Sequence, residues 1–122
     1  MKSYGKELIL DLHECDDVFT RASINKYFED LCLLIDMKRC ELYFWDDVGV
    51  AEEEKQTQAH TKGTSAVQFI LTSNITIHTL DDLKKVFVNI FSCKDFDSDL
   101  AAEHTEGWFG GKVVKRTEID RI

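Results

Sequence analysis

Residues 63–93 have the sequence GTSAVQFILTSNITIHTLDDLKKVFVNIFSC, which contains the most regular pattern in the chain. Apolar and polar side chains alternate over 65–72 and again over 74–78, as they do in strands that bury one face. The next segment fits either a helix or a strand. Its many β-branched and aromatic residues favour a strand over 85–93, after a turn at 81–82. We therefore predict strands in series across this stretch.

The segments on either side add further elements. Period-two alternation predicts strands over 7–13, 40–45 and 112–119. Apolar residues three and four positions apart predict an amphipathic helix from Asp16 to about Met37, capped by Asp16 or Asp17. A final helix is expected to begin near Asp97 and to end at the glycines Gly107, Gly110 and Gly111. Strands in series beside isolated helices predict the α+β class, a two-layer α/β sandwich with two helices on one face of a mainly antiparallel sheet.

Length and composition suit one small domain. The chain has 122 residues, no proline and 43% hydrophobic residues, which predicts a single domain over 1–122 with one core. The one stretch without a clear period is the polar segment 46–63. A loop of this length in a compact chain is usually functional or mobile. The sequence leaves open whether it is a lid or a disordered insertion.

Charge and cysteine spacing exclude several classes of function. Lys and Arg number 15 against 23 Asp and Glu, for a net charge of −8, and no basic face of the kind that binds nucleic acid is present. No apolar run approaches the roughly 20 residues that cross a bilayer, and the start of the chain lacks the features of a secretory signal. The four cysteines and four histidines lack the short spacings of metal sites and disulfide frameworks. We predict a soluble, cytoplasmic protein with no metal and no nucleic-acid or membrane partner.

Several features, in chain order, carry a resemblance to a known family. They are the opening GKELILDLHECD, a serine-containing strand ahead of a second serine, the run TIHT, a strand that ends in Phe-Ser-Cys, and a late helix that contains Glu-His. Together, from about Gly5 to Arg121, they resemble the short bacterial and archaeal S-adenosylmethionine decarboxylases, which are self-cleaving enzymes with a covalent pyruvoyl group. The most specific part of the resemblance is the joint spacing of Ser65, Ser73, His78 and Cys93.

The resemblance implies a role for each of these residues. Ser73 would become the pyruvoyl group, after its hydroxyl attacks the carbonyl of Thr72 and turns the amide at this cleavage junction into an ester. His78 would take the α-proton so that the ester is eliminated, while Ser65 would stabilise the charged intermediate. Cys93 would later return a proton to the substrate carbon. The family also implies a homodimer with active sites at the interface, each built from both protomers.

Chemistry explains why these residue types are needed. Loss of carbon dioxide from an α-amino acid leaves carbanion character at the α-carbon, which a carbonyl condensed with the amine can delocalise. Making that carbonyl from the chain itself requires a hydroxyl at a tight turn, a base that titrates near pH 7, and donors for an oxyanion. Ser73 lies between two predicted strands, where a turn is expected, and His78 comes within reach of it if the second strand folds back.

The sequence also departs from the family pattern. The residue before the converted serine is usually glutamate and here is Thr72, and the residue after it is commonly histidine and here is Asn74. The segment 46–63 lacks the aromatic and proline residues that help to hold adenine, whereas Asp82 could replace a glutamate that contacts the ribose. Two alternatives to S-adenosylmethionine decarboxylation are therefore open. One is a pyruvoyl-dependent decarboxylase of another amino acid, such as arginine or ornithine, and the other is an uncleaved homologue with a binding or regulatory role.

Overall fold

The computed structural model describes residues 3–16 and 19–122 of the chain. Across these residues, six strands, two longer helices and one short 3-10 helix follow one another. Their bounds are β1 Gly5–His13, α1 Arg21–Leu34, β2 Arg39–Trp45, η1 Glu52–Glu54, β3 Gly63–Ile70, β4 Ser73–Leu80, β5 Lys85–Ser92, α2 Ser98–Phe109 and β6 Lys112–Arg121. All six predicted strands are present, each within a few residues of its expected bounds, and the ambiguous segment before Cys93 is a strand.

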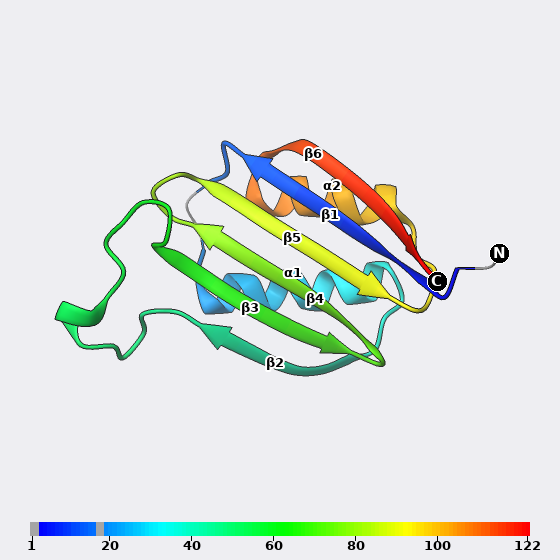
Figure 1. The fold of residues 1–122 in the computed structure, drawn as a ribbon, viewed down its shortest axis with the longest axis horizontal. Coiled ribbons are helices and arrows are strands. Elements are labelled where there is room, and N and C mark those ends of the chain that lie inside the picture. Colours follow the sequence, from blue (N-terminus) through cyan, green and yellow to red (C-terminus); the bar gives the residue numbers. More distant parts are fainter. Residues whose placement is uncertain (1–2, 17–18) are drawn as a thin grey trace.

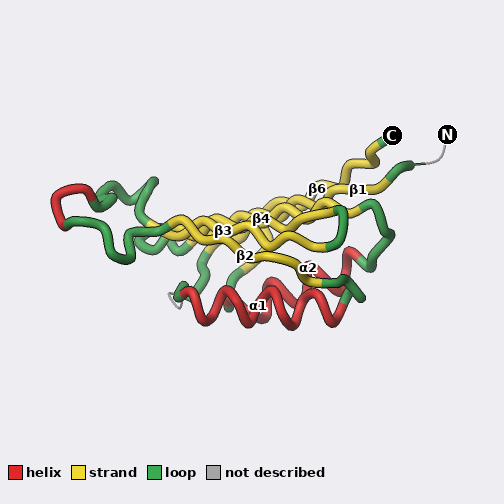
Figure 2. The backbone as a smooth tube through the Cα atoms, turned by 90° about the horizontal axis from the view of Figure 1, so that it is seen from below, coloured by secondary structure: helices red, strands yellow, loops and turns green. Residues whose placement is uncertain are grey.

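The strands form one antiparallel sheet with the order β2-β3-β4-β5-β1-β6 (Figure 1). The three strands predicted in series, β3, β4 and β5, are consecutive neighbours in it, because short turns join antiparallel strands that pair. Both helices lie on the same face of the sheet (Figure 2). The predicted two-layer α+β sandwich is confirmed.

The core lies between the sheet and the two helices. In β1, β4 and β5 every second side chain points toward the helices and is buried. The helices contribute side chains at helical spacing, and the Tyr27 hydroxyl of α1 lies 2.8 Å from that of Thr105 of α2. Each large apolar side chain buried in this way contributes about 1.5–3 kcal/mol. The largest fully buried side chains are Tyr27, Phe28, Phe109, Leu8, Leu10, Leu12, Ile24, Leu31, Ile75, Ile77, Ile90 and Gln68.

The first helix is shorter than predicted at both ends. It begins at Arg21, and Thr20 is its N-cap, because the Thr20 hydroxyl accepts a hydrogen bond from the backbone N–H of Ser23 at 3.0 Å. Asp16 is therefore not the cap, and Asp17 lies outside the described residues. A threonine cap was overlooked because the two aspartates are the more obvious capping residues.

The second helix begins where it was predicted. The Asp97 side chain accepts hydrogen bonds from the backbone N–H groups of Asp99 and Leu100 at 3.0 and 3.1 Å. Gly107 lies inside α2 rather than at its end. The helix stops at Gly110, which has φ of 64°, a conformation that favours glycine.

The sheet face opposite the helices, which we call the open face, carries exposed apolar side chains. Val67 and Phe69 of β3 point this way. Tyr43 of β2 meets Phe69 edge-on with ring centroids 6.2 Å apart, and Tyr43 is 61% exposed. Trp45 on the same face is 56% exposed. An apolar surface of this kind is typical of a protein–protein contact.

The segment 46–63 is a folded loop with defined contacts. It contains η1 and projects beyond the end of the sheet (Figure 2). The Asp47 carboxylate accepts a hydrogen bond from the backbone N–H of Gln56 at 2.9 Å, and the Asp46 carboxylate accepts two from Arg21 of α1. The first of these hydrogen bonds lies within the loop, and the other two attach the loop to α1.

Candidate active site

The peptide bond between Thr72 and Ser73 lies in a tight turn between β3 and β4. Ile70 pairs with Ser73, so Leu71 and Thr72 alone form the turn. Thr72 has φ of 60°, a left-handed conformation that a β-branched residue rarely adopts. Ser73 is the first residue of β4 and is 7% exposed. The turn expected at Ser73 is present, and the strained residue in it is the one whose carbonyl Ser73 would attack.

Cys93 follows β5 directly and lies against this turn. Its Sγ is 3.0 Å from Oγ1 of Thr72, and it accepts a hydrogen bond from the Ser73 hydroxyl at 3.8 Å. The backbone N–H of Cys93 in turn donates to Oγ of Ser73 at 3.1 Å. Hydrogen bonds from Thr72 first and Ser73 second lower the pKa of the Cys93 thiol. We call Thr72, Ser73 and Cys93 the junction cluster.

Ser65 and His78 form a second contact, on the open face. They are opposite each other in the register of β3 and β4, and Oγ of Ser65 lies 2.7 Å from Nδ1 of His78. Gly63, two residues earlier, allows the strands to approach, because a Cβ atom there would overlap the carbonyl oxygen of Thr79. We call Ser65 and His78 the serine–histidine pair.

Two aromatic residues flank the serine–histidine pair. Trp45 of β2 is opposite Ser65, and Phe87 of β5 is opposite His78, so the four residues form one row across four strands. All four line a hollow of about 430 Å³. Sequence reasoning missed Trp45 and Phe87, since only the pairing of strands distant in sequence places them here. Aromatic walls suit a ligand with a flat ring, which stacks on them.

The junction cluster and the serine–histidine pair lie apart within one chain. β4 is continuous from Ser73 to Leu80, so His78 is about 16 Å along an extended strand from Ser73. Side chains alternate along a strand, which turns Ser73 toward the helices and His78 toward the open face. β4 does not fold back on itself. The direct contact between His78 and Ser73 that such a fold would allow is therefore absent within one chain.

Asp82 lies in the turn between β4 and β5, at the end of β4 that is nearer to His78 and farther from Ser73. Its carboxylate is 3.7 Å from Nζ of Lys62, and its side chain is half-exposed. Asp82 does not line the hollow around the serine–histidine pair. Asp82 is therefore at the same end of the sheet as the serine–histidine pair, but it does not share a hollow with it.

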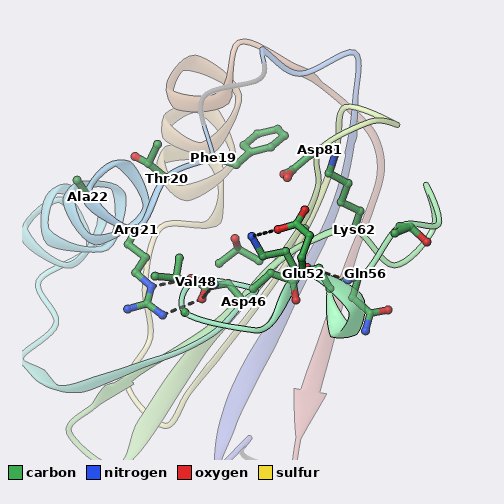
Figure 3. Close-up of a pocket in the computed structure, with 16 residues that line it drawn as sticks. Phe19, Thr20, Arg21, Ala22, Asp46, Val48, Glu52, Gln56, Lys62 and Asp81 are labelled. Atoms are coloured by element: carbon green, nitrogen blue, oxygen red, sulfur yellow. Dashed lines mark hydrogen bonds and ion pairs between the residues drawn. The ribbon is translucent and has the colours of Figure 1, made fainter.

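A larger hollow of about 860 Å³ lies where loop 46–63 meets the start of α1. Figure 3 shows Arg21 facing Asp46 there, with Glu52, Lys62 and Asp81 around the same space. Arg21 donates two hydrogen bonds to Asp46, at 2.6 and 2.7 Å, and these lower the pKa of that carboxyl group. The loop forms a wall common to both hollows, and the residues that line both are Gln56, Gly63 and Thr64.

The cysteines and histidines stay dispersed in the fold. In the part of the chain that the structure describes, no three His, Cys, Asp or Glu side chains are grouped as metal ligands would be. All four cysteines are free thiols, and Cys15 and Cys32 are buried. Among the same residues, no helix combines the length and the apolar character needed to span a membrane.

Comparison with known proteins bears on the whole of this arrangement. A model of the S-adenosylmethionine decarboxylase family matches residues 6–122. The chain belongs to this family. Among solved structures, it is similar in fold to the adenosylmethionine decarboxylase from Aquifex aeolicus, with a TM-score of 0.77 and 18% sequence identity over 99% of this chain and 92% of that chain. A search of curated protein sequences finds no match.

Family membership confirms the resemblance found in the sequence. It also identifies the protein as a decarboxylase. The matched region, 6–122, contains the junction cluster, the serine–histidine pair and Asp82. The candidate residues that the sequence indicated therefore occupy two places in the fold.

Proposed function

We propose that this decarboxylase acts on S-adenosylmethionine, through a pyruvoyl group that it makes by cleaving itself between Thr72 and Ser73. Its product would be the aminopropyl donor for spermidine synthesis in the cytoplasm. The observation that carries the proposal is the junction cluster, in which a serine hydroxyl, a left-handed residue before it and a thiol meet at one turn. A turn that only connects two strands would take glycine or asparagine at the left-handed position.

The residues at the junction fit a pyruvoyl group formed at position 73. Oγ of Ser73 attacks the carbonyl carbon of Thr72, and the C–N bond breaks to leave an ester and a free amino group. Once a base removes the α-proton of residue 73, the ester C–O bond breaks and releases the Thr72 carboxylate. The dehydroalanine that remains takes up water and loses ammonia. The resulting carbonyl would supply the electron sink for decarboxylation.

We place the base for this elimination on a second copy of the chain. His78 lies on the open face, about 16 Å along β4 from Ser73, so its own junction is out of reach. The open face has the exposed aromatic side chains Tyr43 and Trp45 that a partner would cover. Thr72 and Ser73 line a small hollow together with Phe69 of the open face, so the junction can be reached from that side. A two-fold homodimer that packs these faces together would present the serine–histidine pair of each protomer to the junction of its partner. Each dimer would then have two complete sites.

The first test is the mass of the denatured chain. Self-cleavage predicts two fragments, residues 1–72 and residues 73–122, the second of which begins with pyruvoyl and resists N-terminal sequencing. Freshly made protein should convert to these fragments with time. A single intact mass after prolonged incubation would contradict the proposal and favour an uncleaved homologue with a binding or regulatory role.

The substrate is tested by the release of labelled carbon dioxide. S-adenosylmethionine labelled in its carboxyl group should be decarboxylated, whereas labelled arginine and ornithine should not. The nucleoside ring is expected to make the difference, because the row of Trp45 and Phe87 offers it a stacking surface that these amino acids cannot use. Release from arginine or ornithine alone would assign the other substrate class.

Replacing Cys93 by serine should separate cleavage from turnover. The variant is expected to cleave at a rate within about threefold of the original chain, while decarboxylation falls about 100-fold or more, the usual contribution of a positioned proton donor. Fragment masses and carbon dioxide release measure the two steps in the same samples. Cys40→Ser is the matched control, since Cys40 is an exposed thiol whose sulfur bonds the carbonyl oxygen of Lys38 and no residue of the junction cluster, and it should change neither step. Equal losses of cleavage and turnover in Cys93→Ser would contradict the role assigned to Cys93.

A further inference from the structure

Loop 46–63 contributes three polar side chains to the hollow around the serine–histidine pair. They belong to Gln56, His60 and Thr61. The Thr61 hydroxyl donates to the carbonyl oxygen of Gln58 at 3.3 Å, and His60 is exposed. Gln56 is half-buried, and in the described part of the chain its side-chain amide has no hydrogen-bond partner. The Gln56 amide is therefore available to a ligand in this hollow.

The backbone at Gln56 is held in place by hydrogen bonds of the loop. Its N–H donates to the Asp47 carboxylate at 2.9 Å. Asp46, the residue before Asp47, accepts two hydrogen bonds from Arg21 of α1. In Figure 3 the Gln56 side chain points away from Arg21 and Asp46. The amide is thus presented from an anchored backbone, which lowers the entropy that a ligand would lose by ordering it.

The rest of this hollow suits a flat heterocycle. Trp45 and Phe87 provide aromatic surface on either side of the serine–histidine pair, and the volume of about 430 Å³ is typical of a small-molecule site. Stacking does not distinguish one base from another, because every base has an aromatic face. A contact that selects a base has to come from a polar group that reaches the edge of the ring.

We propose that Gln56 binds the edge of the adenine ring and so makes the site specific for an adenine nucleoside. The inference rests on the proposed function, since the adenine belongs to the substrate proposed there. Oε1 of Gln56 accepts a hydrogen bond from the 6-amino group, and Nε2 donates one to the ring nitrogen beside it. A carboxamide matches this donor and acceptor pair, as glutamine does when it reads adenine in DNA.

The test compares the binding of adenosine and purine riboside to intact chains by calorimetry. Purine riboside has the same ring and sugar but lacks the 6-amino group. All chains contain Ser73→Ala, so binding is measured without cleavage. Gln56→Met has a side chain of similar length without the amide, and Gln56→Glu keeps an acceptor for the amino group. Gln58→Met is the matched control, since Gln58 is an exposed residue of the same loop that lines neither hollow.

The ratio of the two affinities is the decisive quantity. We expect the chain with Gln56 to bind adenosine about fivefold or more tightly than purine riboside, because the analogue leaves one hydrogen bond unmade. In Gln56→Met the ratio should fall to within about twofold of one, and in Gln58→Met it should not change. Gln56→Glu should keep the ratio, while adenosine binds more weakly because the donor is lost. A residue that only shaped the loop would weaken both nucleosides equally.

Several results would overturn the inference. They are the absence of adenosine binding, a ratio that Gln56→Met leaves unchanged, an equal fall of the ratio in Gln58→Met, and a ratio that Gln56→Glu loses as fully as Gln56→Met. A chain with Ser73 that never cleaves would overturn the proposed function instead, and the nucleoside ratios would still show whether Gln56 reads the base.

Discussion

Replacing Ser73 by alanine is expected to leave the chain whole and to abolish the release of carbon dioxide from S-adenosylmethionine. Alanine has no hydroxyl to attack the carbonyl carbon of Thr72, so neither the ester nor the ketone can form. Because enzymes accelerate their reactions by about a millionfold or more, activity should fall to the uncatalysed background. Intact mass and labelled carbon dioxide measure both effects.

The fold should survive this change. Ser73→Ala loses the hydrogen bond that Oγ accepts from the backbone N–H of Cys93, which costs about 1 kcal/mol. Ser98→Ala is the matched control, since Ser98 is also 7% exposed and its Oγ has no hydrogen-bond partner among the described residues. The control should cleave and turn over normally. Cleavage in Ser73→Ala, or its loss in Ser98→Ala, would contradict the assignment of Ser73.

The sheet was predictable because its alternation is local. Strands that bury one face repeat with period two, and this pattern shows in the sequence before any partner strand is known. Alternation does not say which face is buried, however. In β3 the more apolar residues Val67 and Phe69 face outward, while Gln68 is fully buried. Arg39 satisfies the Gln68 side chain with hydrogen bonds of 2.9 and 2.7 Å, and Arg39 is distant from it in sequence.

The turn at Ser73 was predictable, whereas the division of the candidate residues between two places in the fold was not. The predicted strands on either side of Ser73 placed it at a turn, and Cys93 meets that turn because β4 and β5 are neighbours. A signal for the division was present in the sequence: Ser73 and His78 are an odd number of residues apart on one strand, which puts their side chains on opposite faces. The contact of Thr72 with Cys93 could not be foreseen, since it depends on the left-handed backbone of Thr72.

His78→Ala should cleave very slowly on its own and regain cleavage from a suitable partner. Removal of His78, the general base that we propose, is expected to slow cleavage about 100-fold or more. If the site combines the junction cluster of one protomer with the serine–histidine pair of the other, a dimer of His78→Ala with Ser73→Ala contains one complete site. That site holds the Ser73 of the His78→Ala chain and the His78 of its partner.

Co-expression of the two variants tests this arrangement by mass. When equal amounts pair at random, about half of the His78→Ala chains have a Ser73→Ala partner and should cleave, while every Ser73→Ala chain stays whole. The matched control is co-expression of His78→Ala with Ser65→Ala. Both changes lie in the serine–histidine pair, which is joined by a 2.7 Å contact, so no combination of these two chains yields a complete site. Recovery of cleavage in both mixtures, or in neither, would contradict a site shared between protomers.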